Sequence, residues 1–148
     1  MAVAAETLSV RLLDPRARPP VRTREGDAGY DLRCLEGFRL APGERAMIGT
    51  GVALALPPNV AGLVTPRSGL AARHGIALVN SPGLVDPNYR GELRVILVNL
   101  GAEPFEARAG DRIAQLLLVP FWAPELEIVE ELPPSERDAD GFGSSGSA

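Results

Sequence analysis

Apolar residues along the chain fall in short runs that glycine or proline interrupts at nearly every boundary. The runs alternate with polar residues or stay apolar for four to eight positions, and they are rich in Val, Ile and Leu. They are LSVRLL (8–13), FRLA (38–41), RAMIGTGVALALP (45–57), VAGLVTP (60–66), IALVN (76–80), GELRVILVNL (91–100), GDRIAQLLLVP (110–120) and LEIVEEL (126–132). This pattern predicts an all-β sandwich or barrel.

One segment has a helical pattern instead. SGLAARHG, residues 68–75, begins with a serine suited to cap a helix N-terminus and ends with a glycine suited to close one. Its apolar side consists of Leu70 and Ala71. We expect one helix of two turns at most, with Ser68 as its N-cap.

The composition changes abruptly after residue 132. The remaining sequence, PPSERDADGFGSSGSA, contains two prolines, several acids and then glycine and serine. Such a segment buries too little apolar surface to offset its ordering entropy. We therefore predict a β-sandwich domain over residues 1–132 and a flexible C-terminal arm over residues 133–148.

Length and charge narrow the possible functions. A chain of 148 residues with 45% hydrophobic content has enough material for one domain with a core. Its net charge of -4 argues against a surface that binds nucleic acid. It has no apolar run of the roughly 18 residues that span a membrane, and its first residues lack the pattern of a signal peptide. Because Cys34 is the only cysteine, a reducing compartment such as the cytoplasm is expected.

The residue types that are missing exclude several chemistries. All 15 basic residues are arginine, which excludes a P-loop lysine and Schiff-base chemistry. His74 and Cys34 are the only residues of their types, so one chain cannot assemble a Cys/His zinc site. An enzyme with this composition would use a carboxylate as its base, arginine and backbone N–H groups to bind anions, and oxygen ligands for a hard cation.

The stretch GLVDPNYRGEL, residues 83–93, places Asp86 and Tyr89 in a turn between strand-like segments. Loops on rigid scaffolds are common positions for chemistry. Aspartate is also favoured in turns for local hydrogen bonding. The stretch by itself leaves both interpretations open.

Two further motifs have a functional and a structural interpretation. In PRSGLA, Arg67, Ser68 and Gly69 would form a phosphate cradle without lysine, or an ordinary helix start with a surface arginine. In DAGYDL, Asp27 and Asp31 would orient water on a divalent cation, Asp31 would fix a nearby arginine, or both would be solvated turn acids.

Two polar or aromatic placements complete the candidates. Gln115 in the apolar run of GDRIAQLLL is either a core amide with satisfied hydrogen bonds or a donor aimed at a ligand. In the arm, Phe142 has no core to enter, which suggests closure over a flat ligand with Arg137 reaching anionic groups. A disordered end with an incidental Phe is the alternative.

Taken in order, DAGYDL, PRSGLA, NSPGLVDPNYRGEL, GDRIAQL and RDADGFGSSG resemble the five motifs of the trimeric dUTPase family, over residues 27–146. The resemblance implies a distorted jelly-roll β-sandwich and a homotrimer whose three active sites are each built from all three chains. It implies hydrolysis of dUTP to dUMP and pyrophosphate, which limits uracil incorporation into DNA and supplies dUMP for dTTP synthesis.

The resemblance also implies roles for the residues of the third motif. Asp86 matches the general base that orients the water attacking the α-phosphorus. Tyr89 matches the aromatic ring that lies against the deoxyribose and leaves no room for a 2′-hydroxyl. Asn80, with the backbone around Gly83 and Leu84, matches the uracil pocket, which is too tight for the methyl group of thymine.

The phosphate end of the substrate has its own matches. Ser68 and Gln115 match residues that hold the phosphate chain, with Arg67 and the Gly69 backbone beside them. Asp31 matches the acid at the edge of the metal and phosphate region, which acts on Mg²⁺ through water. The Mg²⁺ ion is otherwise held by substrate phosphates and water.

The arm supplies the last matches and a departure from the family pattern. Arg137 matches the residue that binds the γ-phosphate, and Phe142, followed by Gly143, matches the ring that covers the uracil. The family usually has small residues between this Arg and Phe, whereas Asp138 and Asp140 intervene here. These acids would repel a triphosphate unless they point outward.

Two other functions compete with this one. A dCTP deaminase or bifunctional deaminase has the same fold and a similar Arg-Ser segment, but it needs a catalytic glutamate, and Asp86 in the hairpin favours attack on phosphate. A non-catalytic jelly-roll nucleotide-binding module would have the sandwich without the chemistry. The presence of both Asp86 and Ser68 argues against it.

Overall fold

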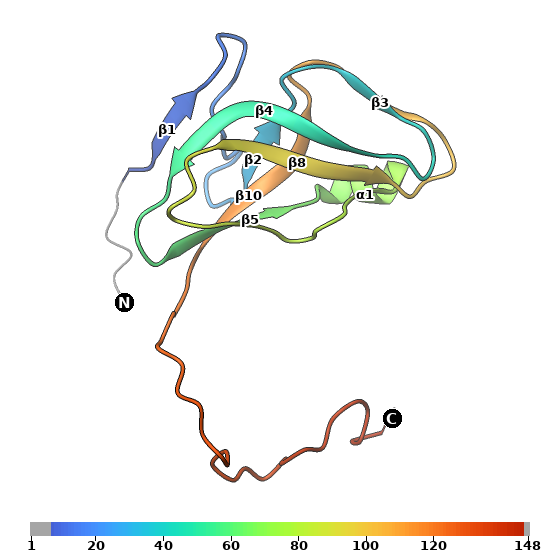
Figure 1. Cartoon of the computed structure of the whole chain (residues 1–148). Coiled ribbons are helices and arrows are strands. Elements are labelled where there is room, and N and C mark those ends of the chain that lie inside the picture. Colours follow the sequence, from blue (N-terminus) through green and yellow to red (C-terminus); the bar gives the residue numbers. More distant parts are fainter. Residues whose placement is uncertain (1–6, 147–148) are drawn as a thin grey trace.

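The computed structural model describes residues 7–146 and shows a β-sandwich with a long C-terminal extension (Figure 1). The first six residues, on which the expectation about a signal peptide falls, and the last two residues of the predicted arm lie outside this range. Two four-stranded sheets and a two-stranded ribbon, all antiparallel, make up the sandwich. The all-β prediction is confirmed.

The first sheet has the order β1-β4-β8-β6. Its strands are β1 (Ser9–Leu12), β4 (Arg45–Ala55), β8 (Glu92–Asn99) and β6 (Ile76–Leu78). The pairing of β4 with β8 shifts register between Gly49 and Ala53, because four steps along β4 face two steps along β8. This bulge includes Gly51 with a φ of 69°, a conformation that favours glycine.

The second sheet has the order β2-β10-β5-β7 and carries most of the candidate site. Its strands are β2 (Tyr30–Arg33), β10 (Arg112–Pro120), β5 (Val60–Thr65) and β7 (Gly83–Val85). Register places Gln115 of β10 between Asp31 of β2 and Thr65 of β5. Residues that are far apart in sequence therefore meet at one end of this sheet.

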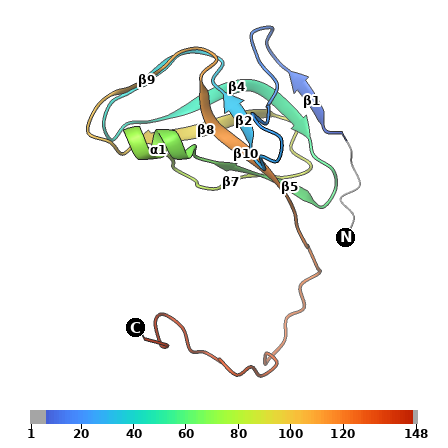
Figure 2. The same cartoon turned by 180° about the vertical axis from the view of Figure 1, so that it is seen from behind.

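A ribbon and one helix complete the sandwich, as Figure 2 shows from behind. The ribbon pairs β3 (Phe38–Leu40) with β9 (Phe105–Ala107). The helix α1 (Ser68–His74) ends at Gly75, whose φ of 68° is left-handed, as predicted. The predicted N-cap is wrong by one residue: Arg67 is the N-cap, and Ser68 is the first helical residue. Arg67, which follows Pro66, keeps an extended backbone and is the last residue before the helix, so the helix begins one residue earlier than expected.

The core lies between the two four-stranded sheets. Its fully buried side chains include Leu32, Val95, Leu97, Ile113 and Leu116, which come from β2, β8 and β10. Leu70 of α1 packs partly against this core, whereas Ala71 is exposed. The alternation of buried and exposed residues along β8 is the period-two pattern expected of a strand with one buried face.

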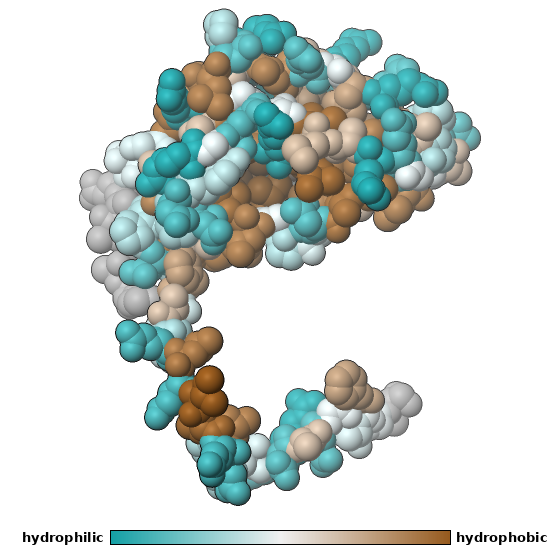
Figure 3. Space-filling model, viewed as in Figure 1, coloured by the Kyte–Doolittle hydropathy of each residue, from teal (hydrophilic) through white to brown (hydrophobic). Residues whose placement is uncertain are grey.

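The chain leaves the sandwich after Pro120 and extends away from it (Figure 1). The run 126–132, which the sequence pattern groups with the strands, forms no strand in this chain. Its apolar side chains find no sheet to join, since Leu126 is 92% and Ile128 is 100% exposed. Figure 3 shows apolar residues along this extension, outside the body of the protein. Within residues 7–146, no helix is both long and apolar enough to cross a membrane.

Candidate active site

The first of two cavities lies beside the turn that follows β7, and we call it the hairpin cavity. It has a volume of about 440 Å³. Its lining combines apolar side chains with one turn carboxylate: Met47, Val64, Leu84, Val85, Asp86, Tyr89, Glu92, Leu93, Arg94 and Ile96. Pairing of β7 with β5 fixes one wall, with Leu84 opposite Leu63 and Val85 opposite Gly62. Three sequence candidates, Leu84, Asp86 and Tyr89, thus line one cavity.

Tyr89 is held by its own turn. Its backbone N–H donates to the Asp86 carbonyl at 3.1 Å, and its hydroxyl donates to the Glu92 carbonyl at 2.8 Å. The ring lies against Gly91, where an added Cβ would come within 2.5 Å of the Tyr89 hydroxyl oxygen. The glycine therefore leaves the space that the ring occupies, and both ends of the tyrosine are fixed relative to Asp86.

Glu92 connects this turn to the bulge in β4. Its Oε1 accepts a hydrogen bond from the Gly51 N–H at 2.9 Å, and its Oε2 pairs with Arg94 Nε at 2.9 Å. Beside it, the buried Thr50 hydroxyl donates to the Leu93 carbonyl at 2.7 Å. The start of β8, and with it the carbonyl that holds Tyr89, is anchored to the bulge.

Asn80 and Gly83 lie together at the other side of the turn. The Asn80 amide comes within 3.4 Å of where a Gly83 Cβ would stand, and Gly83 pairs with Val64 in the sheet. Gly83 is buried and Asn80 is exposed. Neither is among the residues that line the hairpin cavity.

The second cavity, which we call the polar cavity, has a volume of about 730 Å³. It is lined by the loop before β2, the start of α1 and the start of β10: Thr23, Arg24, Asp27, Ala28, Gly29, Asp31, Arg67, Ser68, Gly69, Arg112 and Gln115. Three arginines against two aspartates give this lining a net charge of +1 in a chain whose net charge is -4. Such a cavity suits an anion.

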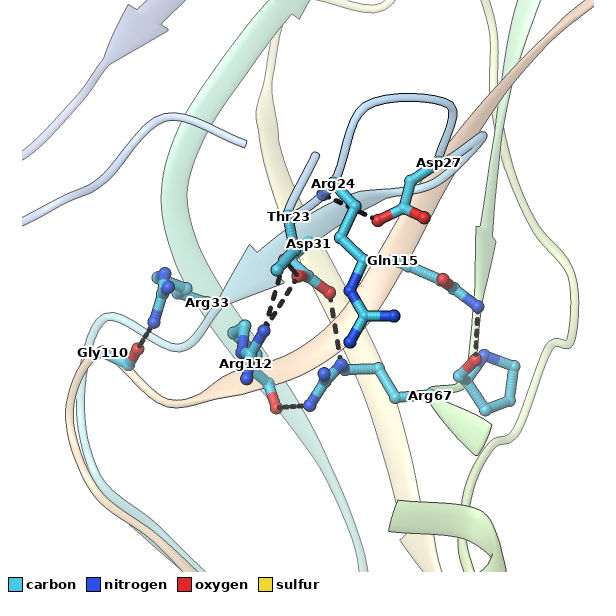
Figure 4. Close-up of polar contacts among 10 residues, drawn as sticks. Thr23, Arg24, Asp27, Asp31, Arg33, Arg67, Gly110, Arg112 and Gln115 are labelled. Atoms are coloured by element: carbon cyan, nitrogen blue, oxygen red, sulfur yellow. Dashed lines mark hydrogen bonds and ion pairs between the residues drawn. The ribbon is translucent and has the colours of Figure 1, made fainter. Parts of the chain in front are cut away.

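Asp31 organises the polar cavity (Figure 4). Its Oδ1 pairs with Arg67 Nε at 3.2 Å, and its Oδ2 pairs with Arg112 at 3.4 Å. The Thr23 hydroxyl also donates to Oδ2 at 2.7 Å. Of the three interpretations for Asp31, the fixing of a nearby arginine is the one seen in this ligand-free chain. Asp27 accepts from the Arg24 N–H at 2.9 Å, as a turn acid does.

Ser68, Gly69 and Gln115 line the same cavity. Ser68 is exposed at the first position of α1, so its hydroxyl is accessible to a ligand. The Gln115 amide donates to the Pro66 carbonyl at 3.0 Å, and its Oε1 lies 2.7 Å from where a Gly29 Cβ would stand. Five of the predicted residues, Asp31, Arg67, Ser68, Gly69 and Gln115, are thus brought together.

The predicted arm residues lie away from both cavities. Arg137 Nε donates to the Asp140 carbonyl at 2.6 Å, within a local turn. Phe142 has a φ of 52° and is fully exposed, and Gly143 follows it with a φ of 88°. In Figure 1 the arm stands apart from the sandwich of its own chain.

The resolved pKa shifts concern groups outside both cavities. Hydrogen bonds from Arg16 lower the pKa of Asp14 to about 2. Burial raises the pKa of the Cys34 thiol, which lies in the core and contacts the Arg108 carbonyl. Neither residue lines a cavity.

Comparison with known proteins identifies the family of this chain. The dUTPase family profile matches residues 16–146. The chain belongs to the dUTPase family. A deoxyuridine 5′-triphosphate nucleotidohydrolase from Anaeromyxobacter sp. is 50% identical over 143 residues, covering 95% of this chain and 97% of the relative. The enzyme of that name from Cutibacterium acnes is 50% identical over 145 residues, covering 97% and 92%.

Solved dUTPase structures share the fold. A mutant dUTPase of Staphylococcus bacteriophage 80alpha, solved with dUpNHpp, superposes with a TM-score of 0.91 at 34% identity, covering 97% of this chain and 100% of the other. A mutant dUTPase of phage phi11, described with a structural Mg(II) ion, has a TM-score of 0.79 at 34% identity, covering 84% and 97%. The expected jelly-roll-like sandwich is therefore confirmed.

Sequence reasoning missed some of the residues that line the two cavities. Thr23, Arg24 and Arg112 line the polar cavity, and Glu92 and Arg94 line the hairpin cavity. Arg112 lies in the fourth motif together with Gln115, and this shared motif could have indicated that Arg112 also lines the cavity. Thr23 and Arg24 lie before the first motif, and only the fold of the preceding loop brings them to the cavity.

Proposed function

We propose that this member of the dUTPase family hydrolyses dUTP to dUMP and pyrophosphate. The observation that supports this most directly is the division of the candidate residues between two cavities of different character. A half-apolar cavity with a carboxylate and a tyrosine suits a nucleoside next to the attacked phosphorus. A cavity with net positive charge suits the phosphates.

Asp86 is the proposed general base. It stands in a turn whose backbone is tied to Tyr89, and it lines the cavity with its neighbour Leu84. As a carboxylate it would accept a proton from the attacking water. The water oxygen then bonds to the α-phosphorus while the bond to the bridging oxygen breaks, and pyrophosphate leaves. General-base assistance of this kind contributes roughly 10²–10⁴-fold.

The hairpin would provide selectivity for base and sugar. Tyr89, fixed at its hydroxyl by the Glu92 carbonyl, would lie against the deoxyribose and exclude a 2′-hydroxyl. Asn80, with the backbone of Gly83 and Leu84, would bind uracil edges. Rejection by a rigid wall depends on the wall being unable to move, and the anchored Tyr89 meets that condition.

The polar cavity would bind the phosphate chain. Ser68, Gly69 and Gln115 would donate hydrogen bonds, and Arg67 would add charge, held in orientation by Asp31. Phosphoryl transfer depends mainly on positioning and on neutralising charge, so this set needs no lysine or histidine.

A magnesium ion would fit the polar cavity if most of its ligands came from water and from the substrate. Among residues 7–146, no group of three or more His, Cys, Asp or Glu side chains could hold a metal. The Asp31 carboxylate at the polar cavity suits Mg²⁺, which keeps several waters and takes its other ligands from substrate phosphates. Bound there, the ion would neutralise phosphate charge, with Asp31 acting through water.

The assembly we propose is a homotrimer with shared sites. Within one chain no residue lines both cavities, and the arm that carries Arg137, Phe142 and Gly143 stands away from them. The extended segment before the arm also leaves Trp122 84% exposed, which a neighbouring subunit would cover. In this arrangement one chain supplies the hairpin cavity, a second chain supplies the polar cavity and a third supplies the arm. The start of the arm at residue 133 remains a prediction.

The test is a parallel assay of pyrophosphate release from dUTP, dTTP, dCTP and UTP, with Mg²⁺ and then with EDTA. We expect release from dUTP alone, abolished by the chelator. Comparable turnover of UTP would contradict the role of Tyr89, and deamination of dCTP would indicate the deaminase relatives. No turnover of any of the four would indicate a non-catalytic module.

A further inference from the structure

Arg24 is a cation of the polar cavity that has no role in the site described above. It lies on the loop before β2 and lines the cavity together with Arg67 and Gln115. Figure 4 shows its guanidinium reaching from the loop into the space between Asp31, Arg67 and Gln115. The side chain is exposed, and its guanidinium is directed toward the cavity.

The loop holds the Arg24 backbone in place. Its N–H donates to Asp27 Oδ2 at 2.9 Å, and the Asp27 N–H donates back to the Arg24 carbonyl at 3.2 Å. The Asp27 carboxylate therefore binds the backbone N–H of Arg24, and it forms no ion pair with the Arg24 guanidinium.

The other two arginines of the cavity are already paired. Arg67 takes one oxygen of Asp31, and Arg112 takes the other. Over residues 7–146, no acid lies within ion-pair distance of Arg24. Arg24 therefore supplies the uncompensated charge of the cavity, and an anionic ligand is the partner that this charge favours.

We propose that Arg24 binds the terminal phosphates of the substrate, those that leave as pyrophosphate. This inference rests on the proposed function. Asp86, which would act at the α-phosphorus, belongs to the other cavity, so the polar cavity receives the phosphates beyond it. A guanidinium presents a planar fork of donors that matches two phosphate oxygens.

This role differs from that of Arg137. Arg137 stands on an arm apart from its own sandwich, so the arm must close before that residue reaches a phosphate. Arg24 is fixed at the cavity before any closure. It would provide the first contact with the triphosphate, and its effect would appear in binding and not in the chemical step.

The test compares Arg24→Gln with Arg22→Gln in the full chain. The two positions share a loop and the substitutions remove the same charge, but Arg22 lies over the Tyr30 ring, with 5.6 Å between its Cζ and the ring centroid, and does not line the cavity. Binding of inorganic tripolyphosphate and of dUMP, both with Mg²⁺, is measured by calorimetry, and the melting temperature checks folding.

We expect Arg24→Gln to weaken tripolyphosphate binding by about tenfold, the scale of one charge-assisted contact. dUMP binding should change by less than about twofold, because dUMP lacks the terminal phosphates. Arg22→Gln should bind both ligands like the wild type, and Arg24→Lys should restore part of the loss through its charge.

Three results would overturn the proposal: unchanged tripolyphosphate binding in Arg24→Gln, an equal loss for dUMP, or no tripolyphosphate binding by the wild type. Failure of the proposed function would look different. In that case the wild type would bind tripolyphosphate in an Arg24-dependent way but would not hydrolyse dUTP.

Discussion

The hairpin cavity and the polar cavity are held in shape by different interactions. The first is fixed by backbone: β7 pairs with β5, and the Tyr89 hydroxyl is bound to the Glu92 carbonyl at 2.8 Å. The second is lined by long charged side chains that Asp31 holds through two ion pairs of 3.2 and 3.4 Å. One cavity is defined by shape and the other by charge.

This difference matches what each cavity would recognise under the proposed function. Uracil differs from thymine by one methyl group, and deoxyribose differs from ribose by one hydroxyl, so selection requires walls that do not yield. Phosphates carry charge and bind through many oxygens, so flexible cationic side chains suffice for them. Substitutions in the hairpin cavity should therefore change chemistry or selectivity, whereas those in the polar cavity should change affinity.

The largest expected effect follows from Asp86→Asn. The amide has nearly the shape of the carboxylate but does not accept the proton of the attacking water. We expect kcat for dUTP to fall by roughly 10²–10⁴-fold with little change in KM, because a base acts mainly in the transition state. Steady-state kinetics of pyrophosphate release would measure this.

The matched control is Glu103→Gln, which makes the same chemical change at an exposed acid outside both cavities. It should leave kcat and KM unchanged. An Asp86→Asn enzyme that retains more than about a tenth of the wild-type kcat would show that Asp86 is not the base.

A smaller effect is expected from Gly91→Ala, measured as the ratio of kcat/KM for dUTP to that for UTP. The added Cβ would lie 2.5 Å from the Tyr89 hydroxyl oxygen and 2.6 Å from Cζ, so the ring has to move. Since a displaced ring no longer blocks the 2′-hydroxyl, we expect the ratio to fall by about tenfold or more.

Tyr89→Phe is the control for this prediction. It removes the hydrogen bond to the Glu92 carbonyl but keeps the ring and the space above Gly91. Because the ring loses its anchor but keeps its space, its selectivity should fall by about threefold, clearly less than in Gly91→Ala. If Gly91→Ala retained full selectivity, the wall that excludes ribonucleotides would have to lie elsewhere.

The sequence pattern was sufficient for the fold class because antiparallel strands have a local signal. Alternation and glycine or proline boundaries marked the long strands β4, β8 and β10. The run over 126–132 forms no strand in the isolated chain, because its apolar pattern needs a partner that one chain does not offer. The interpretation of this run as a strand exchanged between subunits stays a prediction. The N-cap prediction for Ser68 was wrong by one residue, because serine is common both at the N-cap and in the first turn of a helix, and the sequence does not distinguish the two positions.

The sequence identified neighbouring residues of the cavities where they lie in motifs, and it missed those whose position depends on the path of a loop. Gln115 and Asp31 belong to motifs, and the sheet register brings them side by side. Arg24 precedes the first motif, and its approach to the cavity depends on a turn closed by Asp27. No local pattern in the sequence distinguishes it from Arg22, which lies on the same loop with a different role.

The smallest expected effect comes from Gly29→Ala, which places the same methyl group in the polar cavity. The new Cβ would lie 2.7 Å from Gln115 Oε1, nearly as close as the contact of 2.5 Å at Gly91, but with the far end of a flexible side chain. The amide can swing aside while losing its bond to the Pro66 carbonyl. We expect KM for dUTP to rise by about two- to fourfold with unchanged kcat and unchanged discrimination against UTP.

Gln115→Ala, which removes the amide, should raise KM further. A loss of selectivity in Gly29→Ala as large as that in Gly91→Ala would contradict the division between shape and charge, because it would mean that the polar cavity also reads the sugar.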